Sequence, residues 1–237
     1  MLEVLYRDDD LVAVHKPAGL MVHRSELDRR ETRFAVQLLR AQLGRYVFPA
    51  HRLDRGTSGA LLFAFDARTA ARLGQAFESR AIEKRYLAMV RGWPAPAGSI
   101  DHPLRRLADG KDVPEPGAPR QEARTDYRRL ACAEAPIPSR DHGTTRFALL
   151  EVFPRTGRQH QIRRHFKHIS HPVLNDATYG KGPLNRAFAG LFGTSRLLLA
   201  CADLNLAHPA DGRPLRLHAP LEPDFASLCA RLGWTPP

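Results

Sequence analysis

The sequence predicts an α+β fold with a mixed, largely antiparallel sheet flanked by helices, and three observations lead to this class. Segments typical of strands and of helices are interspersed, without the steady strand–helix alternation of a parallel sheet. The 237 residues are 43% hydrophobic, which is enough to bury a sizeable core. The sequence contains no internal repeat and no low-complexity tail, so we expect one domain over residues 1–237.

Hydrophobic periodicity predicts the individual elements in chain order. Two apolar runs around an acidic turn indicate an N-terminal hairpin, and apolar–polar alternation indicates later strands. Apolar residues at helical spacing, such as Ala71, Leu73 and Phe77, indicate helices. The predicted elements are a hairpin over 4–17, a helix over 32–43, an apolar run over 60–65, a helix over 67–80, strands over 84–90, 125–130 and 146–153, a helix over 159–168, a strand over 197–206 and a helix over 225–232.

Residues 105–122 interrupt this pattern. They are rich in charge, and Pro114, Pro116, Gly117 and Pro119 lie close together. Proline and glycine favour turns over regular elements. We expect a surface loop insertion here. A domain boundary is the alternative, but neither flank looks self-sufficient.

The chain is strongly basic, with a formal net charge of +11 and a pI of about 10.3. This charge favours a polyanionic partner, and nucleic acid is the commonest one. Only five of the 36 basic residues are lysine, an arginine excess that a GC-rich genome also produces. The net positive charge does not depend on that bias, so the prediction of a nucleic-acid partner rests on the charge alone.

Cysteine usage and the N-terminus indicate the compartment. Cys132, Cys201 and Cys229 are odd in number, scattered and without CxxC spacing, which favours a reducing environment over a disulfide framework. The N-terminal segment lacks the basic and apolar regions of a signal peptide. No uncharged apolar run approaches the ~18 residues of a membrane span. We therefore expect a soluble, cytoplasmic protein with no membrane partner, and the sequence leaves its oligomeric state open.

The segment His51–Gly59, HRLDRGTSG, carries the most specific chemical signal. It places the carboxylate of Asp54 between Arg52 and Arg55, in a turn before an apolar run. Cations beside a carboxylate keep it ionised when a substrate excludes water, which makes Asp54 a candidate nucleophile. For a shorter match, an Asp–Arg surface pair in a turn is the alternative.

Two further blocks, over 84–86 (KRY) and 155–163 (RTGRQHQIR), supply other candidates. Tyr86 is suited to stack on a base, a contact worth ~1–3 kcal/mol; a half-buried strand tyrosine is the alternative. Arg163 follows the apolar Ile162, so it could point inward, where a permanently charged guanidinium would hold an anionic nucleophile. Phosphate binding or a solvated helix face is the alternative for Arg163.

Four histidines near this block do not have the pattern of a zinc site. His160, His165, His168 and His171 lack the i, i+4 spacing and the glutamate of the common zinc-binding helix. The neighbouring arginines would also repel a dication, so we disfavour a metalloenzyme. The chain further lacks a P-loop, a Rossmann glycine pattern, a G-x-S-x-G motif, and a second carboxylate in the motif of Asp54 for paired-acid glycoside hydrolysis.

These blocks resemble the RluA-type pseudouridine synthases along nearly the whole chain, from about Met1 to about Arg231. The nonamer is similar to the family's catalytic H-R-L-D-x-x-T-S-G signature, and segment 12–23 (VAVHKPAGLMVH) is similar to its first motif. A fourth block begins with the apolar run 197–199. The resemblance implies a pseudouridine synthase-like single domain with a catalytic cleft across the sheet. It also implies an RNA-modifying isomerase that needs no metal or organic cofactor.

The resemblance implies a role for each candidate residue. Asp54 would act at the ribose of a flipped uridine, as nucleophile or by removing the 2′ proton, so that uracil is freed and reattached through C5. Tyr86 would stack on the base and take part in the late proton step, and Arg163 would pair with Asp54. The implied substrate-binding residues are His51, which shapes the loop, Arg52, which fills the space of the flipped nucleotide, and Ile162 and Leu199, which line the base pocket.

Two details bear on the substrate. The continuation Arg24-Ser25 and the lack of an N-terminal S4-like domain are most similar to the branch of the family that modifies uridine 65 of tRNA. Relatives often carry Leu-His-Ala where this chain has Leu199-Ala200-Cys201, a departure that concerns fine positioning. We therefore expect an enzyme acting on tRNA. Modification of ribosomal RNA by the same reaction, and a non-catalytic RNA-binding or ribosome-assembly protein, are the alternatives.

Overall fold

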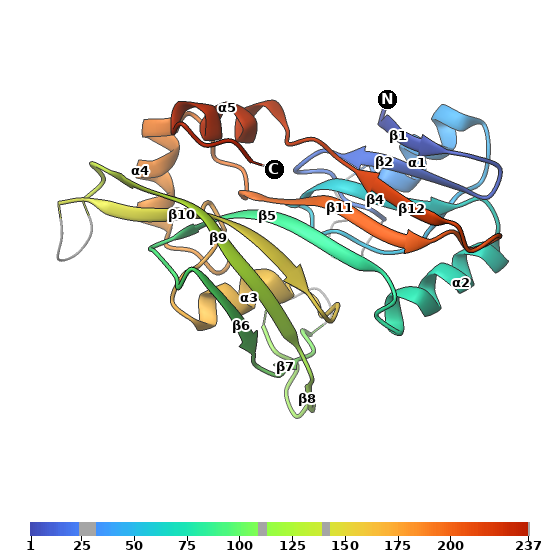
Figure 1. Cartoon of the computed structure of the whole chain (residues 1–237), viewed down its shortest axis with the longest axis horizontal. Coiled ribbons are helices and arrows are strands. Elements are labelled where there is room, and N and C mark those ends of the chain that lie inside the picture. The colour runs from blue at the N-terminus through green and yellow to red at the C-terminus, as the bar shows by residue number, and fades with distance from the viewer. Residues whose placement is uncertain (24–31, 109–112, 139–142, 237) are drawn as a thin grey trace. The chain divides into compact units, whose positions relative to one another are not determined.

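The computed structural model describes residues 1–23, 32–108, 113–138 and 143–236 (Figure 1). Arg24 and Ser25, which carry part of the resemblance, lie outside these ranges. The chain forms two compact units, each assembled from several segments. Unit 1 comprises Met1–Arg85, Leu107–Pro116 and Cys201–Pro220, and unit 2 comprises Tyr86–Arg106, Gly117–Ala200 and Leu221–Pro237. The single catalytic domain over 1–237 stays a prediction.

Unit 1 is built around a sheet with the strand order β1-β2-β4-β11-β12, and β3 pairs with β4. The pairs β1·β2, β2·β4, β3·β4 and β11·β12 are antiparallel. Of β11, residues 201–207 belong to this unit. The elements of unit 1 are β1 (Glu3–Arg7), β2 (Leu11–Lys16), α1 (Ala35–Leu43), β3 (Phe48–Pro49), β4 (Ser58–Ala64), α2 (Ala67–Glu78), β11 (Leu199–Ala207) and β12 (Pro214–His218).

Strand β4 is the central strand of this unit. All seven of its residues are buried, as expected for an apolar strand covered on both faces. Its register on β2 pairs Val12 with Phe63 and Lys16 with Gly59. The chain therefore enters β4 directly from the nonamer, with a register that fixes where the Asp54 loop begins.

The two helices of unit 1 end where the local chemistry requires. Helix α1 stops at Gly44, whose φ of 62° lies in the left-handed region that glycine adopts without strain. Helix α2 starts after Asp66, whose carboxylate accepts hydrogen bonds from the Thr69 amide and hydroxyl, each at 2.8 Å. These two caps lie at the helix ends that agree with the predicted 32–43 and 67–80, whereas α1 begins later and α2 ends earlier than predicted.

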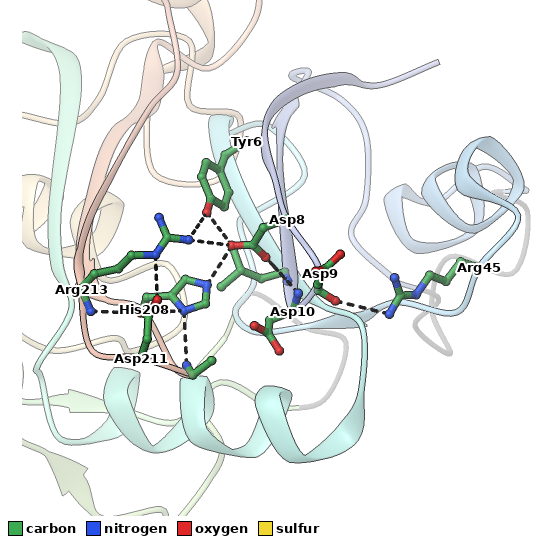
Figure 2. A network of polar contacts seen from close by, with 10 residues as sticks. Tyr6, Asp8, Asp9, Asp10, Arg45, His208, Asp211 and Arg213 are labelled. Carbon is green, nitrogen blue, oxygen red and sulfur yellow. Dashed lines mark hydrogen bonds and ion pairs between the residues drawn. The ribbon is translucent and has the colours of Figure 1, made fainter.

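A polar network connects the β1–β2 turn to the turn between β11 and β12 (Figure 2). The carboxylate of Asp8 contacts the hydroxyl of Tyr6, the Nε2 of His208 at 2.9 Å and the Nη2 of Arg213 at 3.1 Å. The Nε of Arg213 also donates to Asp211 at 3.0 Å. The network thereby joins residues about 200 positions apart in the chain and links the two ends of unit 1 in the sequence.

Unit 2 contains the strand order β5-β10-β9-β6, and its pairs β5·β10, β10·β9 and β9·β6 are antiparallel. Strands β9 and β10 form the longest hairpin in Figure 1. Residues 86–91 of β5 belong to this unit. The elements of unit 2 are β5 (Glu83–Arg91), β6 (Ala97–Asp101), β7 (Leu104–Arg105), β8 (Arg120–Gln121), β9 (Arg124–Ala135), β10 (Thr145–Pro154), α3 (Gln161–His168), α4 (Gly182–Phe192) and α5 (Pro223–Arg231).

The core of unit 2 is apolar and rich in aromatic side chains. Phe147 packs edge-on against Phe188, with ring centroids 5.6 Å apart, and against Phe192 and Trp234. The buried members of this core are Met89, Ala135, Ile137, Phe147, Leu149, Leu174, Phe188, Leu198, Ala200, Phe225, Leu228 and Cys229. Helices α4 and α5 therefore cover one end of the sheet through Phe188 and Phe225.

These observations confirm the predicted α+β class with a largely antiparallel sheet. The predicted hairpin, strands and helices all have counterparts, with ends shifted by a few residues. Helix α4 and strands β6 and β12 were not predicted. Helix α4 begins with Gly182 and Pro183, residues more typical of a turn, although proline in the first turn of a helix is favourable.

The predicted loop over 105–122 contains more order than its composition indicates. Its two ends pair as β7 and β8, and Leu107 forms a bridge with Pro114. Leu107 is buried, so this segment does not lie wholly on the surface as predicted. Residues 109–112 of the loop lie outside the described ranges. Among the described residues, no helix is long and apolar enough to cross a membrane.

Gly59, the last residue of the nonamer, provides a test of the fold. Its φ is 110°, and a Cβ built there would lie 2.1 Å from the backbone oxygen of Cys201. We expect Gly59→Ala to lower the free energy of unfolding by about 3 kcal/mol, through strain and overpacking. Urea unfolding of both proteins measures this.

The matched control is Gly74→Ala in α2, where a Cβ would meet nothing within 4 Å. That change should be neutral or stabilise the protein by up to ~1 kcal/mol, because alanine favours helix. Equal effects of the two substitutions would contradict the close approach at Gly59.

Candidate active site

The Asp54 loop is held by backbone hydrogen bonds on both sides. The Thr57 amide donates to the Asp54 carbonyl at 3.1 Å, which closes a backbone turn over residues 54–57. The Gly19 amide donates to the carbonyl of Arg55 at 2.8 Å, and the Nε of Arg55 donates back to the Gly19 carbonyl at 3.2 Å. The first motif and the nonamer are therefore joined to each other within unit 1.

Lys16 strengthens this junction and was not among the predicted site residues. Its side chain is fully buried at the end of β2. The Nζ donates to the carbonyl oxygens of Pro17 at 3.0 Å, Leu20 at 2.7 Å and Arg55 at 3.2 Å. An ammonium group has three hydrogens to donate, which matches these three carbonyl acceptors. No local sequence pattern signals this burial, because lysine is almost never fully buried unless it is paired.

His51 supports the loop as a neutral ring. Its Nε2 accepts a hydrogen bond from the Leu62 amide at 3.1 Å, and its ring packs on Phe77 with centroids 4.7 Å apart. Burial, reinforced by the charge of Lys84, lowers the pKa of His51 to about 3. Both observations require an unprotonated Nε2, so His51 anchors the loop to β4 and does not exchange protons near neutrality. Arg52, the next residue, is exposed, and its positive charge, after burial, lowers the pKa of His23.

Arg85, beside Tyr86 in the KRY block, is fixed by a buried carboxylate of unit 1. Its Nε lies 2.5 Å from Asp203 on β11, and His218 on β12 contacts the other carboxylate oxygen at 3.0 Å. Burial alone raises the pKa of Asp203, but hydrogen bonds from His218 and Arg85 and the charge of Arg85 outweigh it and hold the pKa below its ordinary value. The backbone just before Tyr86 is thereby anchored.

The remaining candidates lie in unit 2. Tyr86 is 9% exposed and stands opposite Val152 in the β5·β10 pair. Ile162 and Arg163 are buried in the first turn of α3, and Leu199 is buried at the start of β11. Tyr86, Ile162 and Leu199 are thus buried side chains of unit 2, and their place in a base pocket stays a prediction.

Arg163 is held by a partner that was not predicted from the sequence. Its Nε and Nη2 donate to the two carboxylate oxygens of Asp176, at 2.7 and 2.9 Å. Its Cζ lies 5.0 Å from the centre of the Tyr179 ring. Asp176 lies 13 positions from Arg163, so no local spacing rule connects them.

The start of α3 is pinned by Gln161. Its Oε1 accepts from the Thr156 hydroxyl at 2.6 Å and the Arg158 amide at 3.0 Å. Its Nε2 donates to the Arg124 carbonyl and the Thr125 hydroxyl, each at 2.9 Å. This buried amide uses both ends, which ties the helix that carries Arg163 to β9.

The four histidines of this region have separate partners. His160, at a φ of 54°, contacts the hydroxyl of Tyr179, and His171 contacts the carbonyl of Arg91 at 2.8 Å. His165 is buried between the Thr125 hydroxyl and the His102 carbonyl, and burial lowers its pKa to about 4. The ring of His168 stacks on that of His102, with centroids 3.7 Å apart. The four rings thus take part in packing and hydrogen bonding within unit 2.

A cationic cluster surrounds the end of α3. Burial, followed by the charges of His168, Arg120 and Arg164, lowers the pKa of His102. The lowered pKa leaves the His102 ring uncharged near neutral pH, so the permanent positive charges here are those of Arg120 and Arg164, which would attract an anion. We call His102, Arg120, Arg164 and His168 the α3 cationic cluster.

The predicted site residues divide between the two units. His51, Arg52 and Asp54 lie together on one loop of unit 1, whereas Tyr86, Ile162, Arg163 and Leu199 belong to unit 2. Their joint action stays a prediction. Three residues that hold the predicted ones in place were not predicted as site residues, and these are Lys16, Asp176 and Asp203.

Comparisons with known proteins identify the class. Residues 10–168 match the family described as RNA pseudouridylate synthase. The tRNA pseudouridine synthase C of Vibrio cholerae is 44% identical over 238 residues, covering 99% of this chain and 97% of that protein. The enzyme of the same name from Salmonella typhi is 45% identical over 99% of this chain and 91% of its own length.

Solved structures agree with the sequence matches. Human RNA pseudouridylate synthase domain containing 1 superposes with a TM-score of 0.73 at 25% identity, over 96% of this chain and 87% of that one. The human domain containing 4 protein gives the same TM-score and identity over 99% and 94%. The fold and the sequence define a pseudouridine synthase. The chain belongs to the RNA pseudouridylate synthase family, whose members are isomerases that act on RNA, and the predicted RluA-type resemblance is confirmed.

His51 gives a pH-dependent prediction. The unfolded chain binds a proton at His51 near pH 6.5, whereas the folded protein does so only near pH 3, so acid favours unfolding between these values. Between pH 7 and 5 this costs about 2 kcal/mol. We expect His51→Gln, which keeps an acceptor for the Leu62 amide, to show a correspondingly flatter dependence in urea unfolding. Parallel curves for the two proteins would contradict a neutral His51.

The α3 cationic cluster gives a prediction for RNA binding. Replacing Arg164 by glutamine should reduce the slope of log affinity against log salt by ~0.7–0.9, the loss of one phosphate contact. Filter binding of tRNA at several salt concentrations measures the slope. The control is Arg213→Gln, because Arg213 is already paired with Asp8 and Asp211. An equal change in both variants would show a general charge effect instead.

Proposed function

We propose that this enzyme converts a specific uridine of tRNA to pseudouridine, and that the target is uridine 65. The observation that carries the proposal is the 44–45% identity, over nearly the whole chain, to enzymes named tRNA pseudouridine synthase C. The basic charge of +11 and the α3 cationic cluster support a polyanionic substrate. A tRNA-modifying role places the enzyme in the cytoplasm.

The proposed reaction is an isomerisation in which no atom is gained or lost. The N1–C1′ bond of a flipped uridine breaks, the uracil rotates, and a C5–C1′ bond forms. The proton on C5 then leaves and N1 regains one, so that the conjugation of the ring is restored and the mass is unchanged. The target nucleotide has to leave the stack first, at a cost of a few kcal/mol.

We assign Asp54 to the ribose of the target, either as the nucleophile at C1′ or as the base for the 2′ proton. The tight turn closed by Thr57 and the Lys16 junction support this assignment, because a reacting group has to be held in place. Arg163 pairs with Asp54 in this scheme and keeps it anionic. The chemistry calls for no metal and no organic cofactor.

The other residues receive supporting roles. Tyr86 stacks on the uracil and takes part in loss of the C5 proton, for which its burial on β5 is suited. Ile162 and Leu199 line the base pocket as buried apolar side chains. The exposed Arg52 enters the space of the flipped nucleotide, and His51 shapes the loop from behind.

Tritium release from RNA labelled at uracil C5 tests the function, because pseudouridine has the same mass as uridine. We expect release from labelled tRNA and none from labelled ribosomal RNA. Asp54→Asn should slow release by at least ~10³-fold, as for loss of a catalytic nucleophile. Its tRNA affinity should change by less than about threefold, because phosphate contacts dominate binding.

The matched control is Asp9→Asn, which removes an exposed carboxylate from the β1–β2 turn of the same unit. It should keep the wild-type rate. Release from ribosomal RNA alone would support the same reaction and show that the substrate is ribosomal RNA and not tRNA. Normal release by Asp54→Asn, or a loss of RNA affinity of about tenfold, would remove Asp54 from the proposed role.

A further inference from the structure

Asp176 and Arg163 form a buried ion pair with a defined plane. The side chain of Asp176 is fully buried and that of Arg163 is 10% exposed. Two parallel hydrogen bonds, from Nε and Nη2 to the two carboxylate oxygens, align the guanidinium with the carboxylate. A single bond would allow the guanidinium to rotate, whereas this arrangement fixes its plane.

The same guanidinium also lies over the ring of Tyr179. The ring centre lies 5.0 Å from the Cζ of Arg163, within the range of a cation–π contact. The amides of Thr178 and Tyr179 both donate to the Oδ1 of Asp176 at 2.9 Å. One carboxylate oxygen therefore positions the aromatic ring and the guanidinium together.

The backbone that carries Asp176 is itself held in place. Its carbonyl accepts from the Gly180 amide at 3.0 Å and from the Nδ2 of Asn185 at 2.9 Å. Asn175, at a φ of 60°, donates through its side chain to the Thr194 carbonyl, and its amide donates to the Oδ1 of Asn185. The segment is thus fixed independently of the ion pair.

Stability alone does not account for this arrangement. A buried ion pair is often no more stabilising than well-packed apolar side chains of the same volume, because both charges lose their hydration. The bidentate contact with Asp176 is made through the Nε and Nη2 of Arg163. Because the guanidinium is planar, fixing these two nitrogens also sets the direction in which Nη1 points.

We propose that Asp176 is a positioning residue for the reaction. Together with the ring of Tyr179, it sets the plane of the Arg163 guanidinium and so the orientation in which Arg163 acts in the proposed reaction. This inference rests on the proposed function, in which Arg163 pairs with Asp54. It adds a residue that lies outside the recognised motifs.

The test is the single-turnover rate of tritium release from labelled tRNA, measured beside tRNA affinity and thermal stability. Asp176→Asn keeps the shape of the side chain and removes its charge. We expect its rate to fall ~100-fold, the size of effect that misplacement by about 1 Å produces, with tRNA affinity within about threefold. A rate within about fivefold of wild type would overturn the proposal.

The matched control is Asn185→Ala, which removes hydrogen bonds to the Asp176 carbonyl and the Asn175 amide without touching the guanidinium. It should lower thermal stability while keeping the rate within about fivefold of wild type. If instead its rate falls as far as that of Asp176→Asn, the carboxylate acts only through the stability of the segment, and the proposal is overturned.

A second experiment remains decisive if Asp176→Asn fails to fold. Arg163→Ala and the double variant Arg163→Ala/Asp176→Asn are compared with and without millimolar methylguanidinium. Removing both charges avoids leaving one of them buried alone, so the double variant should fold. We expect methylguanidinium to raise the rate of Arg163→Ala by at least about tenfold and to leave the double variant unchanged. The same response in both variants would overturn the proposal.

The wild-type rate of tritium release separates a failure of the proposed function from a failure of the positioning role of Asp176. If the wild-type protein releases no tritium from either tRNA or ribosomal RNA, the proposed function is wrong. If it releases tritium while Asp176→Asn does so equally well, the function stands and the positioning role is wrong.

Discussion

The loop that carries Asp54 depends on the ammonium group of Lys16. Its three hydrogen bonds reach carbonyls on both sides of the junction between the first motif and the nonamer. If the ammonium were absent, the carbonyls of Pro17, Leu20 and Arg55 would each lose one hydrogen bond, at a net cost of about 1 kcal/mol each. The amides of Leu20 and Gly19 would still donate to the carbonyls of Pro17 and Arg55. The β2·β4 register, which pairs Lys16 with Gly59, then carries the same constraint into the sheet. One buried charge thus links the first motif, the loop that carries Asp54 and the sheet.

Unit 2 holds its candidate site residue Arg163 in another way. The helix that carries Arg163 is anchored by the amide of Gln161, and the guanidinium by the carboxylate of Asp176. The Gln161 amide bonds through its oxygen and its nitrogen, and the Asp176 carboxylate bonds through both of its oxygens. Neither group can therefore rotate without losing at least two hydrogen bonds. Fixed groups need less reorganisation when charge develops in a reaction, which is why such networks are suited to catalysis. Each unit thus contains a fixed cation. In unit 1 three carbonyls hold Lys16, and in unit 2 a carboxylate holds Arg163.

The sequence predicted those parts whose signal is local. The antiparallel strands follow from alternation, and the nonamer places Asp54, Arg52 and His51 on one loop because they are neighbours in the chain. The partners of these residues have no such signal. Asp176 lies 13 positions from Arg163, and Asp203 lies 118 positions from Arg85. Only the folded chain brings such pairs together, so supporting residues were missed where primary candidates were found.

The arrangement of acceptors also determines whether a site suits arginine or lysine, as positions 16 and 163 show. Only five of the 36 basic residues are lysine, and one of them, Lys16, is fully buried. Its site offers three carbonyls around a point, which matches the three donors of an ammonium and not a planar fork. At position 163 the demand is the reverse, because a carboxylate edge and an aromatic face together require a flat cation. General composition explains neither residue, since each site selects its cation by the arrangement of its acceptors.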